Sequence, residues 1–167
     1  LLSPRVWDGI TGLAAIPVDT PRIVADFQVL QLVAVAPEGV HSLSMRSSGH
    51  VAGGVYRATV WVGAPSNANV RLMVRDSENP RTGSPTNETD VKVDLHSLAM
   101  IESHGDVLES GVEQPADGWR RMWVDLKLSD GNIVVALFFL ESGSNFHVFK
   151  PKGQRLLLGG FDIIRLQ

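Results

Sequence analysis

The amino-acid sequence predicts an all-β fold, a sandwich or a barrel of antiparallel strands. Short apolar runs alternate with turn residues along the chain, and 16 glycines and 9 prolines are spread among them. Several runs place an apolar side chain at every second position, which is the period of a strand with one buried face. Apolar stripes with helical spacing are scarce. The 167 residues are expected to form a single domain, 1–167, that buries a core without disulfides or metal.

Residues 54–63 and 70–76 predict the first pair of strands. The first segment directs one face inward with Tyr56, Ala58, Val60 and Val62, and the other outward with Arg57, Thr59 and Trp61. The second segment directs Val70, Leu72 and Val74 inward and Arg71, Met73 and Arg75 outward. Turn-forming residues at 65–69 separate the two segments, so we expect a β-hairpin.

Residues 119–128 and 133–140 predict a second hairpin. Asp130 and Gly131 between them favour the positive φ angles of a tight hairpin turn. In the first strand the inward residues would be Met122, Val124, Leu126 and Leu128, and the outward residues Trp119, Arg121, Trp123, Asp125 and Lys127. The second strand is apolar on both faces, which predicts a central position in a sheet.

The remaining segments are assigned from local composition. Residues 155–166 predict the last strand, in which Gly159 and Gly160 indicate a bulge or a close approach of neighbouring backbone. Residues 77–90 contain no large apolar side chain and are expected to form a mobile loop. We expect a short helical turn at 97–102 and a strand around 107–112. Periodicity leaves residues 23–36 open between a strand and a buried helix.

Composition excludes several classes of function. A net charge of −3 without a basic stripe argues against binding to nucleic acid. The longest apolar stretch, 23–36, is interrupted by polar residues and is too short for a membrane span. Cysteine is absent, which excludes a disulfide scaffold, a thiolate metal site and a cysteine nucleophile. The chain opens without methionine or a signal-peptide pattern, so we expect a piece of a longer or processed chain.

No motif of a metal centre or a catalytic site occurs in the sequence. The nearest cluster of metal-ligating residues, which we interpret as solvated loop side chains, is His96, Glu102, His104 and Asp106. Calcium sites leave no sequence pattern. A nucleophile elbow is absent, and the single tyrosine, Tyr56, is predicted to point into the core, which disfavours a lyase with a tyrosine base. A glycosidase needs two carboxylates in a cleft. Most acidic residues of this sequence are expected in loops and turns, and Asp125, which is expected on a strand, is the exception.

The outward face of the two predicted hairpins is the candidate site. It would gather Trp61, Arg71, Arg75, Arg121, Trp123 and Asp125 on one surface. Indole faces stack on sugar rings and guanidinium groups bind hydroxyls or carboxylates in pairs, so this surface favours a flat ligand. The alternative is that arginine stems lie over the indoles as cation–π pairs, with the face packed against the N-terminal segment or another domain. The residue types alone do not decide between these two interpretations.

From His41 to the end, the succession of segments resembles the carbohydrate-binding modules of the 4/9/22 type. The resembling segments are Gly54-Val55-Tyr56-Arg57-Ala58-Thr59-Val60-Trp61-Val62, Val70-Arg71-Leu72-Met73-Val74-Arg75-Asp76, Gly118-Trp119-Arg120-Arg121 and Leu158-Gly159-Gly160-Phe161-Asp162-Ile163. Their order carries the resemblance more than any one motif. It implies a galactose-binding-like jelly roll that binds glycans without catalysis, often with a structural Ca²⁺. It also implies that Trp61, Arg75, Arg121 and Trp123 line a groove.

We therefore predict an all-β, jelly-roll-like antiparallel β-sandwich that acts as a non-catalytic, glycan-binding accessory module. Its ligand would be a polysaccharide or glycan, and no cofactor is expected beyond the calcium that the resemblance implies. By the same resemblance it would be secreted or at the cell surface, beside other domains of a parent chain. The alternative is a structural or assembly domain whose tryptophan and arginine face packs on a partner. A polysaccharide lyase or glycosidase ranks third.

Overall fold

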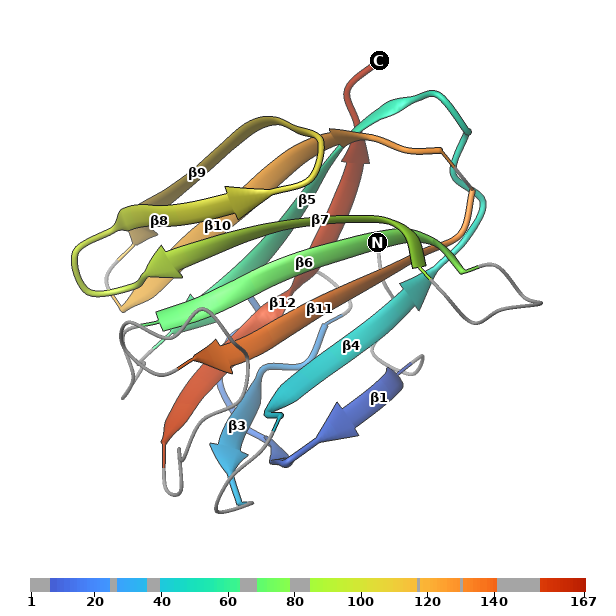
Figure 1. The fold of residues 1–167 in the computed structure, drawn as a ribbon. Coiled ribbons are helices and arrows are strands. Elements are labelled where there is room, and N and C mark those ends of the chain that lie inside the picture. The colour runs from blue at the N-terminus through green and yellow to red at the C-terminus, as the bar shows by residue number, and fades with distance from the viewer. Residues whose placement is uncertain are drawn as a thin grey trace.

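The computed structural model describes residues 7–24, 27–35, 40–63, 69–78, 85–116, 118–129, 131–140 and 154–167. These residues form two antiparallel sheets that face each other across one core (Figure 1). In spatial order, the first sheet contains β1 (Trp7–Thr11), β4 (Ser42–Ser47), β11 (Ile133–Leu140), β6 (Asn69–Glu78), β7 (Pro85–Asp94) and β8 (Ala99–His104). The second contains β2 (Leu13–Pro17), β3 (Leu30–Ala34), β12 (Arg155–Arg165), β5 (Val55–Gly63), β10 (Trp119–Lys127) and β9 (Val107–Ala116). The predicted antiparallel β-sandwich is confirmed.

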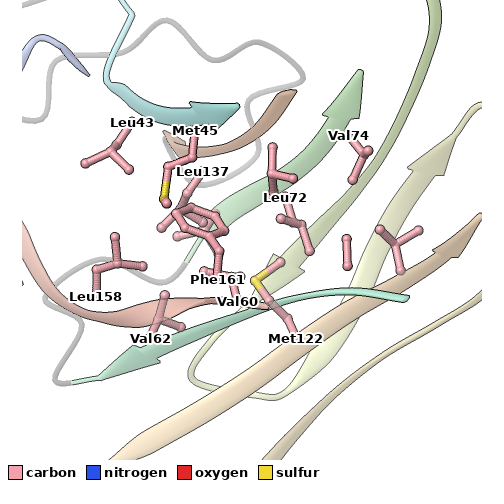
Figure 2. Packing of buried hydrophobic residues seen from close by; sticks show 14 of the residues in the cluster. Leu43, Met45, Val60, Val62, Leu72, Val74, Met122, Leu137, Leu158 and Phe161 are labelled. Carbon is pink, nitrogen blue, oxygen red and sulfur yellow. The ribbon is translucent and has the colours of Figure 1, made fainter. Parts of the chain in front are cut away.

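The core lies between the two sheets. It consists of the side chains that the alternation of apolar and polar residues predicts to point inward. Val60, Met122 and Phe161 from the second sheet face Leu72 and Leu137 from the first, and all five are fully buried (Figure 2). Burial of a large apolar side chain of this kind contributes about 1.5–3 kcal/mol relative to exposure. Within the described residues no helix is long and apolar enough to cross a membrane.

Both predicted hairpins are wrong. β5 pairs with β10 and β12 in the second sheet, whereas β6 pairs with β11 and β7 in the first. β10 and β11 likewise belong to different sheets. In each case the two strands lie in different sheets, on opposite sides of the core. Alternation fixes which side chains are buried, but two strands that face each other across a core show the same pattern as two that are paired.

Several single-strand predictions are confirmed. β11 is a central strand between β4 and β6. β12 follows the predicted last strand, and its register against β5 shifts between Leu158 and Gly160, which is the expected bulge. β9 includes the strand expected around 107–112. Within residues 23–36 the described strand is β3, so the buried-helix alternative is wrong there.

The helical turn expected at 97–102 is also wrong, because β8 occupies most of that range. Residues 95–98 form a turn instead, in which Leu98 has a φ of 56°. Asp94 closes this turn, since its Oδ1 accepts hydrogen bonds from the N–H groups of His96 and Ser97 at 2.8 and 3.1 Å. The bond from Ser97 is the main cause that lowers the pKa of the Asp94 carboxyl below its ordinary value.

Part of the loop expected at 77–90 is instead strand. β6 continues to Glu78 and β7 begins at Pro85, and the two pair along their length. A backbone ladder can extend beyond the apolar core, because its hydrogen bonds do not depend on hydrophobic side chains. Residues 79–84 of the expected loop lie outside the described residues, and the mobility of the segment stays a prediction.

Candidate functional site

β5 and β10 lie side by side in the second sheet, and their outward side chains form one continuous face. We call this surface the Trp–Arg face. Its residues lie opposite one another in three pairs, Trp61 with Arg121, Thr59 with Trp123, and Arg57 with Asp125. Both indole rings are partly buried and lie on the same side of the sheet, and Trp61 packs against residues of the buried hydrophobic cluster.

Guanidinium groups lie against the indole rings of this face. The Cζ atom of Arg57 is 5.1 Å from the ring centre of Trp123. The Cζ atom of Arg121 is 5.5 Å from the ring centre of Trp61 and 5.9 Å from that of Trp123. These distances fall within the range of cation–π attraction, which contributes about 0.5–1 kcal/mol at exposed sites. Arg121 therefore connects the two tryptophans.

Carboxylates hold both guanidinium groups in place. Arg57 donates from Nε and Nη2 to the two oxygens of Asp125, at 2.7 and 2.8 Å. The Nη2 atom of Arg121 pairs with Glu113 on β9, and Nη2 of Arg57 lies 4.0 Å from Glu109. The hydrogen bond to Asp125 raises the pKa of the Arg57 guanidinium above its ordinary value. Both arginines are thus charge-compensated within the protein.

A glycine on β9 leaves the space that the Trp123 ring occupies. Trp123 lies opposite Gly111, and a methyl group added at Gly111 would be 2.2 Å from Cη2 of the indole. The ring therefore extends over the edge strand, where only glycine leaves space. The indole Nε1 is buried and has no hydrogen-bond partner in the described structure. Sequence reasoning missed Gly111 and Glu113 because their roles depend on the register between β9 and β10.

A third tryptophan extends the aromatic surface at one end. Trp119 pairs with Gly63 on β5, and its ring lies 3.0 Å from where a Cβ of Gly63 would be. A Cβ at Gly159 would come within 2.8 Å of the same ring. The glycines of β5 and β12 therefore form a flat backbone surface that the indole covers.

The structure divides the six candidate residues between the two sheets. Trp61, Arg121, Trp123 and Asp125 lie together, whereas Arg71 and Arg75 project from β6 on the outer surface of the first sheet. There Nε of Arg71 is 3.3 Å from Asp90, and Nη2 of Arg75 is 3.5 Å from Glu88. Arg71 and Arg75 are absent from the Trp–Arg face because β6 does not pair with β5 in the predicted hairpin.

The histidine cluster singled out in the sequence is only partly assembled. His104 lies between two carboxylates, with Nδ1 3.1 Å from Asp90 and Nε2 3.1 Å from Glu102. No group of three or more histidine, aspartate and glutamate side chains in the described part of the chain is arranged to hold a metal ion. A structural Ca²⁺ stays a prediction from the resemblance.

Comparison with known proteins identifies the fold. No protein-family model matches the sequence, and no curated protein matches it. The chain aligns over 100% of its length with 90% of the CBM22-1 xylan-binding domain of Paenibacillus barcinonensis Xyn10C, at a TM-score of 0.56 and 13% identity. It aligns over 95% of its length with 85% of TmCBM61, a structure in complex with β-1,4-galactotriose, at a TM-score of 0.50 and 13% identity.

A third match is the enzymatically active domain of tailspike protein 4 of bacteriophage CBA120, with a TM-score of 0.54 and 7% identity. That alignment covers 99% of this chain but only 19% of the tailspike chain. The two-sheet architecture is therefore the jelly-roll β-sandwich found in carbohydrate-binding modules, as the resemblance implied.

Proposed function

We propose that the chain is a non-catalytic glycan-binding module and that the Trp–Arg face is its contact surface. The observation that carries this proposal is the position of Trp61 and Trp123, partly buried on one side of the second sheet and surrounded by hydrogen-bonding groups. A sugar ring offers C–H groups to an indole and hydroxyls to charged side chains. The fold shared with modules that bind xylan and galactotriose supports glycan as the class of ligand.

The charges of this face favour a neutral glycan. Arg57 and Arg121 each pair with a carboxylate, so neither offers an uncompensated positive charge to an acidic polymer. The carboxylates at the β9 rim are exposed: Glu113, the partner of Arg121, is 41% exposed, and Glu109 is 71% exposed. Such a rim accepts hydrogen bonds from hydroxyl groups and repels phosphates, sulfates and uronates.

Binding should be weak. If each indole covers about 50–100 Å² of sugar, stacking contributes about 1–2.5 kcal/mol per ring. Two rings then correspond to a Kd between roughly tens of millimolar and hundreds of micromolar. Weak contacts suit an accessory module, because a polymer offers many copies of the same unit and other domains of a parent chain add to the attachment. We propose such a setting, in a secreted or cell-surface protein.

The cation–π contacts favour a second candidate function, a structural or assembly domain. Arg57 and Arg121 already lie against the rings, and a partner domain could seal this prearranged surface without stacking on it. In that case the indoles would contribute packing area to an interface rather than contacts to sugar.

Glycan binding separates the two candidates. The wild-type chain is screened on a glycan array and its affinity for the best ligand is measured by calorimetry, together with Trp61→Ala and Trp123→Ala. Each variant should bind about 5- to 70-fold more weakly, the equivalent of one lost stacking contact, while thermal stability is largely retained. Arg75→Ala on the other sheet should bind like the wild type. Absence of any glycan binding, or equal loss in Arg75→Ala, would contradict the proposal.

A further inference from the structure

The indole of Trp119 differs from the other two indoles on the outward side of the second sheet. Guanidinium groups lie against the rings of Trp61 and Trp123, at 5.1 to 5.9 Å from the ring centres. Among the described residues no cation lies over the ring of Trp119, and no second aromatic ring packs against it. A ligand that stacks on Trp119 therefore does not compete with an arginine for the ring.

Backbone and one neighbouring side chain fix the position of the Trp119 ring. A Cβ added at Gly63 would be 3.0 Å from Cε3 of the indole, and one added at Gly159 would be 2.8 Å from Cζ3. The ring therefore extends from β10 across β5 to β12. The atom added at Gly159 would also be 3.2 Å from Cβ of Ile23, so Ile23 lies beside the ring. A ring held in this way loses little conformational freedom when a ligand stacks on it.

The residues level with Trp119 across the second sheet carry no charge. In register order this row is Ala116, Trp119, Gly63, Leu157, Gln31 and Ile16. Paired residues of antiparallel strands project to the same side of a sheet, so the row lies on the outward side with the Trp–Arg face. Trp119, Leu157 and Gln31 are partly exposed. The row is thus an uncharged surface next to the row that contains Arg121.

We infer that Trp119 is the main stacking surface for a neutral sugar ring, at one end of the Trp–Arg face. This inference rests on the proposed function, because it places the glycan on the same side of the same sheet. The apolar face of a sugar ring packs on an indole, and an uncharged surround favours a sugar without a carboxylate or sulfate. Arg121 is two residues away on β10, so hydrogen-bond donors for sugar hydroxyls adjoin the ring.

The position of Trp119 also sets the direction of the bound chain. Trp119 and Trp123 are four residues apart on β10, which corresponds to about 13 Å at about 3.3 Å per residue. A linear glycan that contacts both indoles therefore lies along β10. An oligosaccharide too short to reach from one indole to the other loses one of the two contacts, so the test uses hexasaccharides.

A panel of neutral hexasaccharides built from glucose, galactose, mannose or xylose is titrated into the ¹⁵N-labelled wild type and followed by NMR. The chain has four tryptophans, whose indole N–H signals are assigned with single variants. At least one member of the panel should bind saturably and shift the signal of Trp119. Absence of binding by every member, or a Trp119 signal that stays in place while other indole signals move, would overturn the inference.

Variants are compared by calorimetry with the hexasaccharide that binds the wild type most tightly. Trp119→Leu keeps an apolar side chain over the two glycines but removes the aromatic face. It should bind at least about fivefold more weakly and lose at least as much affinity as Trp61→Ala, whereas Trp119→Phe should stay within about threefold of the wild type. Ile10→Ala, an exposed apolar position on the first sheet, should bind like the wild type. Thermal unfolding shows whether each variant is folded.

The variants also distinguish a wrong assignment of Trp119 from a wrong function. If Trp61→Ala and Trp123→Ala weaken binding and Trp119→Leu does not, the Trp–Arg face binds glycan and the role given to Trp119 is wrong. If no glycan of the array binds, the proposed function fails and the role of Trp119 fails with it. If Trp119→Leu does not fold, the Trp119 signal in the wild-type titration decides.

Discussion

Arg57 and Asp125 face each other across β5 and β10 and share two hydrogen bonds, while the same guanidinium group lies 5.1 Å from the ring centre of Trp123. One carboxylate therefore fixes a cation, and that cation lies against an indole. Asp125 is only 4% exposed, so its charge is compensated by Arg57 more than by water. The ion pair thus stabilises the pairing of β5 with β10 and also fixes the position of the guanidinium group beside Trp123.

Replacement of this carboxylate should destabilise the domain. Asp125→Ala removes both hydrogen bonds and leaves the guanidinium without its main partner, so we expect the free energy of unfolding to fall by about 1–3 kcal/mol. Urea denaturation followed by tryptophan fluorescence measures the change. Glu88→Ala is the matched control, because Glu88 is half-exposed and lies 3.5 Å from Arg75, and it should cost less than about 1 kcal/mol. Similar losses in both variants would contradict the assigned role of Asp125.

Gly111→Ala should disturb Trp123 directly. The added methyl group would overlap the indole, so the ring must move, and overpacking of this kind typically costs about 1–3 kcal/mol. We expect a changed tryptophan emission spectrum and weaker binding of any glycan that contacts this face. Gly9→Ala on β1 serves as the control, since the added methyl group would lie 3.5 Å from Oγ of Ser44, an ordinary van der Waals contact. An unchanged spectrum for Gly111→Ala would show that the ring does not rest over β9.

Phe161→Ala should be strongly destabilising. The side chain is fully buried between the sheets, and removal of a buried phenylalanine costs about 3–5 kcal/mol through lost burial and a residual cavity. Thermal and urea unfolding measure the loss. Ile164→Ala lies on the same strand, is 45% exposed, and should change the stability by about 0.5 kcal/mol or less. Comparable effects of the two substitutions would contradict the inward position of Phe161.

Stability should fall at mildly acidic pH because of His50. Its ring is half-buried, 2.8 Å from Oγ of Ser47 and edge-on to Tyr56, and burial lowers its pKa below the ordinary 6.5. The unfolded chain therefore takes up a proton near pH 6.5 while the folded chain does not. The contribution of this group is present above pH 6.5 and is lost as the pH falls toward the lower pKa of the folded state.

Urea denaturation of the wild type and His50→Gln between pH 5 and 8 measures this contribution. The difference in stability between the two proteins should be constant above about pH 7 and shift in favour of the variant below pH 6.5. The two proteins differ only at residue 50, so contributions from the rest of the chain cancel in the comparison. A difference independent of pH would contradict the lowered pKa.

The sequence revealed the faces of the strands but not their partners. Alternation placed Tyr56 and Val60 inward and Trp61 outward correctly, because a strand with one buried side has a period of two. Pairing was inferred from short connections, and it failed for β5 with β6 and for β10 with β11. A short connection can join two paired strands of one sheet or two strands in different sheets. The local sequence does not distinguish these two arrangements.

The same limit applied to the candidate site. Trp61 and Trp123 share a face as expected, yet they do so because β5 pairs with β10, a contact between segments about 60 residues apart in the printed sequence. Arg71 and Arg75 were placed with them through the failed hairpin. Gly111 and Glu113 could not be recognised, since only the register of β9 places them beneath Trp123 and beside Arg121.

The position of β12 has a consequence for how the molecule assembles. This last strand lies between β3 and β5, so the centre of the second sheet is incomplete until residues 155–165 have been synthesised and have docked. Folding therefore requires contacts between distant parts of the chain. Domains with such non-local contacts fold slowly, in roughly milliseconds to seconds. Until β12 arrives, β3 and β5 each expose an unsatisfied backbone edge, and a truncated or stalled chain would be prone to aggregate through those edges.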